Sequence, residues 1–270
     1  MNGLRPESIK LIAFDLDGTL FNRHAQISDR TTGTLAKVAE LGVQLVIASG
    51  RSQRSILPRV EGLPFVQWAI CSNGATRYDL VARQPAKVEL MAAEHIQDLV
   101  DAVQAVVPEA VWAWESTTSH VWTESFVQSQ LSGGRRQRVV ADHTGPGTDT
   151  LKVVVGHPDI DQYELLDRVA PMIPHGLTAS TSGAPFVEVT GPGVTKAKGL
   201  AELCHDLDID PGSTAAFGDN VNDIEMLRWV GYGVAMANAH PRLKAVAENH
   251  TDRHHDEDGV ADALERLFSL

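Results

Sequence analysis

The stretch AFDLDGTLFN, Ala13 to Asn22, contains two aspartates one residue apart, Asp15 and Asp17, directly after an apolar run that begins at Ile9. Gly18 and Thr19 follow at once. Two neighbouring carboxylates repel each other unless a cation lies between them or one of them holds a proton. The stretch therefore predicts a buried strand that ends at a site for a metal ion, a proton, or both.

The composition of the chain is that of a protein that folds in water. Its fractions of 43% hydrophobic and 21% charged residues are ordinary for a globular protein. The length of 270 residues favours a main domain with a smaller partner over a single core. The net charge of −12 opposes binding to nucleic acid. No apolar run is long enough to span a membrane, and the first residues lack a secretory core, so we expect a cytoplasmic protein without a membrane partner.

Strands and helices alternate near both ends of the chain, which predicts a Rossmann-like parallel sheet covered by helices on both faces. The predicted strands and helices are Ile9–Phe14, a helix from Ser28, Val43–Ala48, Trp68–Cys71, a helix over Val194–His205, Thr214–Phe217, a helix through Trp229, Tyr232–Met236 and a closing helix over Gly259–Leu270. Cys71 and Cys204, the two cysteines, are expected to be small buried apolar residues.

The pattern changes in the middle of the chain. Ala92–Val107 has helical periodicity, and AVWAWESTTSHVWTE (110–124) alternates apolar and polar residues as an antiparallel strand pair does. We therefore predict an inserted α+β domain over residues 83–189 and a core domain over 1–82 and 190–270. The tryptophans of the middle segment are expected in its core, and Arg135, Arg136 and Arg138 in an exposed loop that could meet an anionic substrate.

Polar residues follow several of the predicted parallel strands, and such residues meet at one edge of a sheet. They are Asp15, Asp17, Ser49, Asn73, Asp219, Asn222 and Asp223. Four converging carboxylates require a divalent cation, and oxygen ligands favour Mg²⁺. Taken singly, each residue has an ordinary explanation as a helix cap or an acidic turn, and Lys196 as a surface lysine. Their occurrence together favours one site.

These segments resemble the haloacid dehalogenase-like (HAD) phosphohydrolase superfamily, in particular its Cof-type branch. Its D-x-D-G-T-[LV] motif corresponds to Asp15–Leu20, its strand-ending Ser or Thr to Ser49, its helix-opening lysine to Lys196, and its G-D-x-x-N-D motif to Gly218–Asp223. GYGVAMANA and EDGVADAL also resemble the tail of that branch. The resemblance implies a HAD-like core with an inserted α/β cap domain.

The resemblance also implies roles for individual residues. Asp15 would be the nucleophile that forms an aspartyl-phosphate, Asp17 the general acid and base, and Ser49 and Lys196 the groups that hold the phosphoryl oxygens. Lys198 is the alternative to Lys196. The implied Mg²⁺ ligands are Asp15, the backbone carbonyl of Asp17, Asp219 and Asp223, and the implied substrate contacts are Gly18, Thr19, Gly50, Arg51, Asn73 and Asn222.

The expected activity is a Mg²⁺-dependent phosphatase for small phosphorylated metabolites such as sugar, nucleotide or cofactor phosphates. A phosphotransferase or phosphomutase of the same superfamily and a noncatalytic phosphometabolite sensor are the alternatives. We expect a monomer or a homodimer. His250, His254 and His255 depart from the Asn that relatives often have near this position, and because they lack the spacing of a metal site we expect a solvated surface there.

Overall fold

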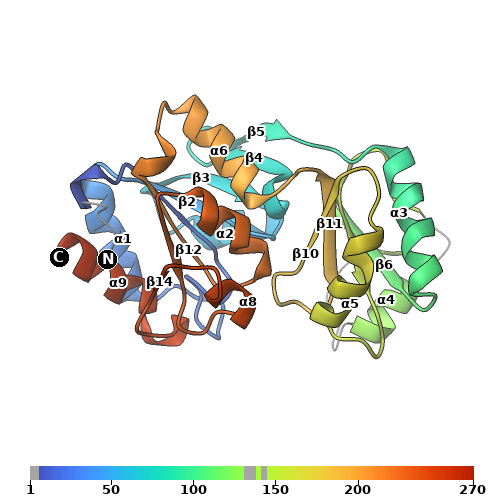
Figure 1. The fold of residues 1–270 in the computed structure, drawn as a ribbon. Coiled ribbons are helices and arrows are strands. Elements are labelled where there is room, and N and C mark those ends of the chain that lie inside the picture. Colours follow the sequence, from blue (N-terminus) through green and yellow to red (C-terminus); the bar gives the residue numbers. More distant parts are fainter. Residues whose placement is uncertain (1–5, 131–137, 141–144) are drawn as a thin grey trace. The chain divides into compact units, whose positions relative to one another are not determined.

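The chain consists of two units in the computed structural model, which describes residues 6–130, 138–140 and 145–270. Unit 1 comprises Met1–Lys87 and Thr195–Leu270, and unit 2 comprises Val88–Val194. Unit 2 is therefore inserted into unit 1, as the colours along the chain in Figure 1 show. These divisions lie a few residues beyond the predicted boundaries at 82/83 and 189/190.

Unit 1 is built on an eight-stranded sheet with the order β14-β13-β12-β1-β2-β3-β4-β5. The strands are β1 (Leu11–Phe14), β2 (Gln44–Ala48), β3 (Val66–Cys71), β4 (Thr76–Asp79), β5 (Gln84–Val88), β12 (Thr214–Gly218), β13 (Tyr232–Ala235) and β14 (Asn249–His250). From β14 to β3 neighbouring strands are parallel, and β4 is antiparallel to β3. The sequence correctly predicts this parallel core.

Helices cover both faces of the unit 1 sheet. Every residue of β1 and β12 is buried, and because successive side chains of a strand point to opposite faces, neither face is open to solvent there. The helices are α1 (Asp29–Glu40), α2 (Gln53–Val60), α6 (Lys196–Asp206), α7 (Ile224–Trp229), α8 (Pro241–Lys244) and α9 (Gly259–Phe268). Cys71 and Cys204 are buried in this core, as predicted.

Local sequence signals explain where the first long helix begins and ends. The Ser28 hydroxyl accepts a hydrogen bond from the Thr31 backbone N–H at 3.0 Å, which caps the first turn of α1. Gly42, just beyond the last turn, has a φ of +85°, a left-handed conformation that stops the helix.

Short 3-10 helices occur at Pro6–Ser8, Ser72–Gly74, Ala170–Met172, Pro211–Ser213, Val221–Asp223 and His255–Glu257.

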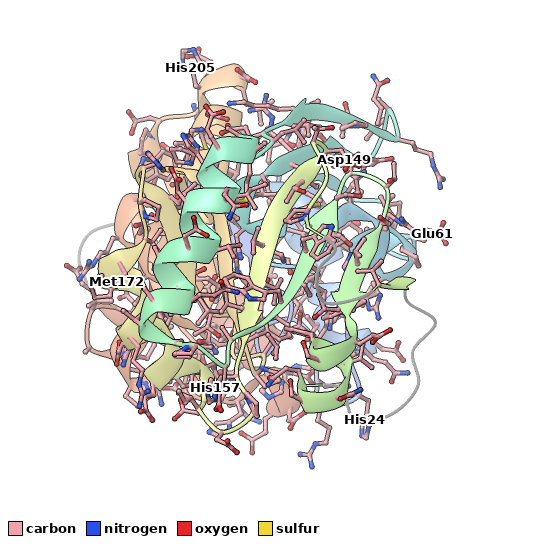
Figure 2. The ribbon with its side chains drawn as sticks, turned by 90° about the vertical axis from the view of Figure 1, so that its right-hand side faces the viewer. His24, Glu61, Asp149, His157, Met172 and His205 are labelled. Atoms are coloured by element: carbon pink, nitrogen blue, oxygen red, sulfur yellow. The ribbon has the colours of Figure 1, made fainter. Side chains whose placement is uncertain are left out.

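Unit 2 is an α+β fold with a six-stranded sheet in the order β10-β11-β9-β6-β7-β8. Its strands are β6 (Val111–Ser116), β7 (His120–Thr123), β8 (Arg138–Val140), β9 (Thr150–Gly156), β10 (Leu177–Ser180) and β11 (Val187–Pro192), and its helices are α3 (Ala93–Val106), α4 (Glu124–Gln130) and α5 (Gln162–Val169). Figure 2 shows α3 lying across this sheet, with Asp149 and His157 at opposite ends of β9.

The predicted antiparallel strand pair of the middle segment is confirmed as β6 and β7. Trp114 and Trp122 on these strands are buried, as expected for core residues, whereas Trp112 is half-buried. On the neighbouring strands, Lys152 lies buried between the carboxylates of Glu188, at 2.5 Å, and Glu115, at 3.4 Å. These two contacts compensate the charge of the buried ammonium group.

The sequence prediction contains no counterpart of β4, β5, β8, β10 or β14. Four of these strands, β5, β8, β10 and β14, lie at the edge of a sheet, and none of the five is longer than five residues, so none carries a readable alternation. The expected exposed loop at Arg135 and Arg136 lies outside the described residues, as does the side chain of Arg138. Among the described helices, none combines the length and the apolar composition required to cross a bilayer.

Candidate active site

The strands of unit 1 bring the predicted polar residues to one edge of the sheet. Asp15 directly follows β1, and its backbone N–H donates to the Phe217 carbonyl of β12 at 3.0 Å. Ser49 follows β2, and its N–H donates to the Ile70 carbonyl of β3 at 2.8 Å. Asp219 follows β12. Because these strands are parallel neighbours, their carboxyl ends meet, which is the usual ligand position in such sheets.

Three carboxylates and one ammonium group form the centre of the site. Asp15, Asp219 and Asp223 each offer one carboxylate oxygen, and these oxygens lie within 4.8 Å of one another. The Nζ of Lys196 donates to Asp15 Oδ1 at 2.6 Å and to Asp223 Oδ1 at 2.7 Å. Lys196 is fully buried, with 1% of its surface exposed, so these contacts are shielded from water. We call these four residues the acidic cluster.

Burial and neighbouring charges shift the titration of the acidic cluster. Burial raises the pKa of Asp15 from 3.8 to about 7, although the Lys196 ammonium group acts in the opposite direction. Burial and the carboxylates of Asp15 and Asp223 raise the pKa of Asp219 well above its ordinary value. Burial disfavours the charge of Lys196, but the carboxylates of Asp15 and Asp223 outweigh this and raise its pKa. Lys196 is therefore an ammonium ion.

The acidic cluster fits a hard divalent cation. The atoms that it offers to a metal ion are all carboxylate oxygens, the ligand type that Mg²⁺ prefers. The negative charge of three ionised carboxylates would also exceed the positive charge of one lysine. Asp219 Oδ1 is buried and has no hydrogen-bond partner among the described residues. Such an atom is costly unless a ligand satisfies it. Asp223 Oδ2 instead accepts from the backbone N–H groups of Asp219 and Asn220, both at 3.0 Å, which fixes the loop after β12.

The side chain of Asp17 lies in an ion pair with Arg51. Arg51 Nε donates to Asp17 Oδ2 at 2.5 Å and Nη2 donates to Oδ1 at 2.6 Å. The guanidinium carbon of Arg51 also lies 5.9 Å from the ring centre of Phe21. Both oxygens of Asp17 therefore serve as acceptors, and its carboxylate is not one of the three that meet at the acidic cluster.

Ser49, Gly50, Asn73 and Asn222 line the same edge of the sheet. The Ser49 hydroxyl accepts from the Arg51 N–H at 3.2 Å, within the turn that contains the buried Gly50. The N–H of Asn73 donates to the Ser49 carbonyl at 3.1 Å, and Asn222 Nδ2 donates to Asn73 Oδ1 at 3.0 Å. Asn222 Oδ1 is buried and has no hydrogen-bond partner in the described part of the chain. The structure thus brings these four residues together.

Gly18 allows the chain to pass close to the acidic cluster. Its φ is +78°, a conformation that favours glycine, and a Cβ atom at this position would lie 2.3 Å from Asp219 Oδ2. The next residue, Thr19, has a buried Oγ1 without a hydrogen-bond partner among the described residues. Both features are typical of a loop that binds a ligand close to its backbone.

The start of α6 brings Lys196 into the site. Thr195 caps this helix by accepting a hydrogen bond from the Lys198 N–H at 3.1 Å. Gly74 lies against Thr195 with a φ of +107°, and a Cβ atom there would lie 2.2 Å from the Thr195 carbonyl oxygen. The Nζ of Lys198 lies 3.7 Å from Glu202 Oε1 on the half-exposed side of the helix. Of the two lysines, Lys196 is therefore the one that contacts the carboxylates of Asp15 and Asp223.

Two residues near the site, Asn238 and His255, are absent from the predicted set of site residues. Asn238 Nδ2 donates to the Gly18 carbonyl at 2.8 Å, and His255 Nδ1 lies 2.7 Å from the Phe21 carbonyl. The expectation of a solvated surface is therefore wrong for His255, while His250 and His254 are exposed. Asn238 could have been found, since it comes shortly after the parallel strand β13. His255 follows no long strand and gives no such signal.

Comparisons with known proteins agree with this architecture. Residues 12–264 match the family model of the haloacid dehalogenase-like hydrolases. The chain is 31% identical to the 5-amino-6-(5-phospho-D-ribitylamino)uracil phosphatase YcsE of Bacillus subtilis, over 95% of this chain and 94% of that protein. It is 29% identical to the pyridoxal phosphate phosphatase YbhA of Escherichia coli, over 90% of this chain and 95% of that protein.

The fold is also found in solved structures. SMU.1108c from Streptococcus mutans UA159 superimposes with a TM-score of 0.83 at 22% identity, covering 97% of this chain and all of that chain. The similarity at this level of identity concerns the fold alone.

Proposed function

Because the chain belongs to the haloacid dehalogenase-like hydrolase family, in its Cof-type branch, we propose that it hydrolyses phosphomonoesters of small metabolites in a Mg²⁺-dependent reaction at the acidic cluster. The observation that most supports this is the meeting of Asp15, Asp219 and Asp223 with the buried Lys196 at the carboxyl ends of β1 and β12. An excess of buried carboxylate oxygens suits a divalent cation and a phosphoryl group that bind together.

In this proposal Asp15 is the nucleophile. One of its carboxylate oxygens attacks the phosphorus atom, the bond from phosphorus to the ester oxygen breaks, and the departing oxygen takes a proton from Asp17. Water then attacks the phosphorus of the aspartyl-phosphate, Asp17 accepts a proton from it, and inorganic phosphate leaves with Asp15 restored. Lys196 orients the Asp15 carboxylate through its 2.6 Å contact with Oδ1.

The residues of the acidic cluster would hold the cation. Asp15, Asp219, Asp223 and the backbone carbonyl of Asp17 are the proposed ligands. Bound Mg²⁺ would offset the repulsion between the carboxylates and the phosphoryl oxygens. Ser49, Lys196 and the unpartnered hydroxyl of Thr19 would hold the phosphoryl oxygens, with Gly18 and Gly50 leaving room for them.

Asp17 has to give up one contact with Arg51 before it can donate a proton. Both of its oxygens accept from the Arg51 guanidinium group, so neither can carry a proton toward the substrate in this arrangement. An incoming phosphate would compete with Asp17 for the same guanidinium donors. We therefore assign Arg51 to the substrate side of the site, together with Asn73 and Asn222.

Unit 2 would act as the cap domain that determines substrate specificity. The relatives named above are phosphatases of a ribitylaminouracil phosphate and of pyridoxal phosphate, which are small and chemically different phosphomonoesters. A common acidic cluster in unit 1 and a variable second unit would account for such a range of substrates.

Phosphate release from a panel of phosphorylated sugars, nucleotides and cofactors, measured with Mg²⁺ and with EDTA, tests the proposal. Asp15→Asn should lower release by at least about 10³-fold without unfolding the protein. Asp206→Asn is the matched control, because it removes a carboxylate that pairs with Arg77 at the far end of α6. Release that persists in EDTA or in Asp15→Asn would contradict the proposal.

The same assay separates hydrolysis from transfer. Hydrolysis yields one inorganic phosphate for each substrate consumed, whereas a transferase or mutase yields a new phosphate ester that phosphorus NMR detects. A folded protein that binds Mg²⁺ and these compounds without converting any of them would instead be a sensor.

A further inference from the structure

The loop between Asp15 and Phe21 is held from outside by two side chains of the last part of unit 1. Within the loop, the Phe21 N–H donates to the Leu16 carbonyl at 2.7 Å. The carbonyls of Gly18 and Phe21 accept from Asn238 Nδ2, at 2.8 Å, and from His255 Nδ1, at 2.7 Å. Because a carbonyl oxygen only accepts, the proton of His255 must lie on Nδ1.

The two side chains support each other. The backbone N–H of His255 donates to Asn238 Oδ1 at 3.0 Å. The Asn238 amide thus has an N–H facing its oxygen and a carbonyl facing its nitrogen, so its orientation is determined by its partners. Asn238, His255 and the loop carbonyls form one continuous chain of hydrogen bonds, all within unit 1.

The turn that carries Asn238 also holds the loop after β12. The His240 N–H donates to the Asp219 carbonyl at 2.8 Å, and the Met236 N–H donates to the Gly218 carbonyl at 2.9 Å. The turn at 236–240 therefore contacts both loops that supply the acidic cluster. The Asn238 side chain contacts the loop after β1, and the backbone N–H groups of Met236 and His240 contact the loop after β12.

These hydrogen bonds act on a loop whose conformation depends on the backbone of Gly18. Gly18 has no side chain, and its φ of +78° determines how the preceding Asp17 peptide is turned relative to the rest of the loop. A small rotation there would change the distance between the Asp17 peptide and Asp219. Hydrogen bonds to the carbonyls of Gly18 and Phe21 limit that rotation from the C-terminal side of the Asp17 peptide, and the hydrogen bond from the Asp15 N–H to the Phe217 carbonyl holds its N-terminal side.

We propose that Asn238 and His255 are positioning residues that fix the Asp17–Phe21 loop and thereby set the affinity of the acidic cluster for Mg²⁺. Neither residue is among the proposed metal ligands or substrate contacts, so they act through the loop backbone. The inference rests on the proposed function, because it requires the cation to bind at the acidic cluster. Residues that orient metal ligands in this way affect metal affinity by about 10- to 100-fold.

Isothermal titration calorimetry with Mg²⁺ on the full chain tests this without an activity measurement. Asn238→Leu removes both hydrogen bonds and adds no charge, and we expect it to weaken Mg²⁺ binding by about tenfold. Asn249→Leu is the matched control, since Asn249 is also half-buried and donates to a backbone carbonyl, that of Gly233 at 3.2 Å, in the edge pair β13–β14. It should bind Mg²⁺ as the wild type does.

A second set of variants covers the case in which Asn238→Leu does not fold. His255→Ala removes the donor to Phe21 and should also weaken binding, whereas His255→Asn, whose amide can donate, should restore it. His250→Ala changes an exposed histidine of the same segment and should have no effect. A role in stability alone would lower the melting temperature without this pattern of loss and rescue.

The outcomes separate this inference from the proposed function. If Asp219→Asn loses Mg²⁺ binding while folded Asn238→Leu and His255→Ala bind as tightly as the wild type, the positioning role is wrong and the metal site stands. If Asp219→Asn binds Mg²⁺ like the wild type, the acidic cluster is not the metal site, and both proposals fall.

Discussion

At the scale of the residue, the site depends on a carboxylate and an ammonium group that are both buried. Asp15 and Lys196 are 2.6 Å apart, with 5% and 1% of their surfaces exposed. A buried charge is tolerated only when it is paired and hydrogen-bonded, and Lys196 meets this condition through Asp15 and Asp223. Asp15 shares the ammonium group of Lys196 with Asp223, so its charge is only partly compensated.

The raised pKa of Asp15 predicts how the stability of the Mg²⁺-free protein depends on pH. Burial raises this pKa from 3.8 to about 7, so the folded state binds the proton more tightly than the unfolded state does. The stabilising effect is fully present below pH 3.8 and is lost as the pH rises toward 7. Asp15→Asn cannot ionise, and we expect the wild type to lose melting temperature relative to Asp15→Asn as the pH rises from about 4 to about 7.

Thermal unfolding of both proteins in EDTA measures this difference, which includes the effect of the Asp15 charge on the raised pKa of Asp219. Saturating Mg²⁺ should reverse the trend, because a bound cation favours the ionised carboxylate. A difference in melting temperature that does not change with pH would show that folding does not raise the pKa of Asp15.

Single residues also mark the limit of what the sequence predicts. The spacing of Asp15 and Asp17 and the pattern of parallel strands were sufficient to predict that Asp15, Asp219 and Asp223 lie at one edge of the sheet. They could not show that the Asp17 carboxylate pairs with Arg51, because the strand periodicity ends at Phe14 and Gly18 turns the chain out of register. The contacts of His255 depend on the path of the chain after β14, which no local pattern encodes.

At the scale of the element, the position of α6 depends on a close backbone contact with the turn after β3. Gly74 lies against the Thr195 carbonyl, and Lys196 is the first residue of the helix that Thr195 caps. The sequence predicts this helix over Val194–His205, close to the observed Lys196–Asp206. It gives no indication of the contact with Gly74, because the two segments are about 120 residues apart and belong to different halves of unit 1.

Replacing Gly74 should therefore displace Lys196. Gly74→Ala puts a Cβ atom 2.2 Å from the Thr195 carbonyl oxygen and adds the strain of a φ of +107°. We expect phosphatase activity to fall by at least about tenfold and the free energy of unfolding by about 1 to 3 kcal/mol. Urea unfolding and phosphate release on the same preparations measure both effects.

Gly42→Ala is the matched control for this change. Gly42 also has a positive φ, +85°, but nothing lies within 4 Å of the position that a Cβ atom would take there, so the variant adds backbone strain without a collision. It should lose stability and keep its activity. Equal losses of activity in Gly74→Ala and Gly42→Ala would mean that the contact with Thr195 does not position Lys196.

At the scale of the whole molecule, the two units differ in what they contain. Unit 1 contains all three carboxylates of the acidic cluster and its lysine, although its sequence is interrupted by unit 2. In unit 2, the buried carboxylates of Glu115 and Glu188 pair with the ammonium group of Lys152, which compensates their charge without a metal ion. Mg²⁺ is therefore expected to act on the stability of unit 1 alone.

Hydrogen exchange with and without Mg²⁺ tests this division in the intact chain. A ligand stabilises the structure that binds it, so peptides that cover residues 15–21 and 219–223 should exchange more slowly in Mg²⁺. Peptides from β9 and α5 of unit 2 should exchange at the same rate in both conditions. Slower exchange confined to unit 2 would place the cation elsewhere and contradict the proposed site.

The most direct test of the central claim is the mass of the Asp15 peptide after acid quenching during turnover. The wild type is mixed with Mg²⁺ and its best substrate from the panel, quenched within the first turnovers and digested for mass spectrometry. We predict that the peptide containing Asp15 gains the mass of one phosphoryl group and that fragmentation assigns it to Asp15 and not to Asp17. Rapid phosphate release with an unmodified Asp15, together with full activity in Asp15→Asn, would contradict the account.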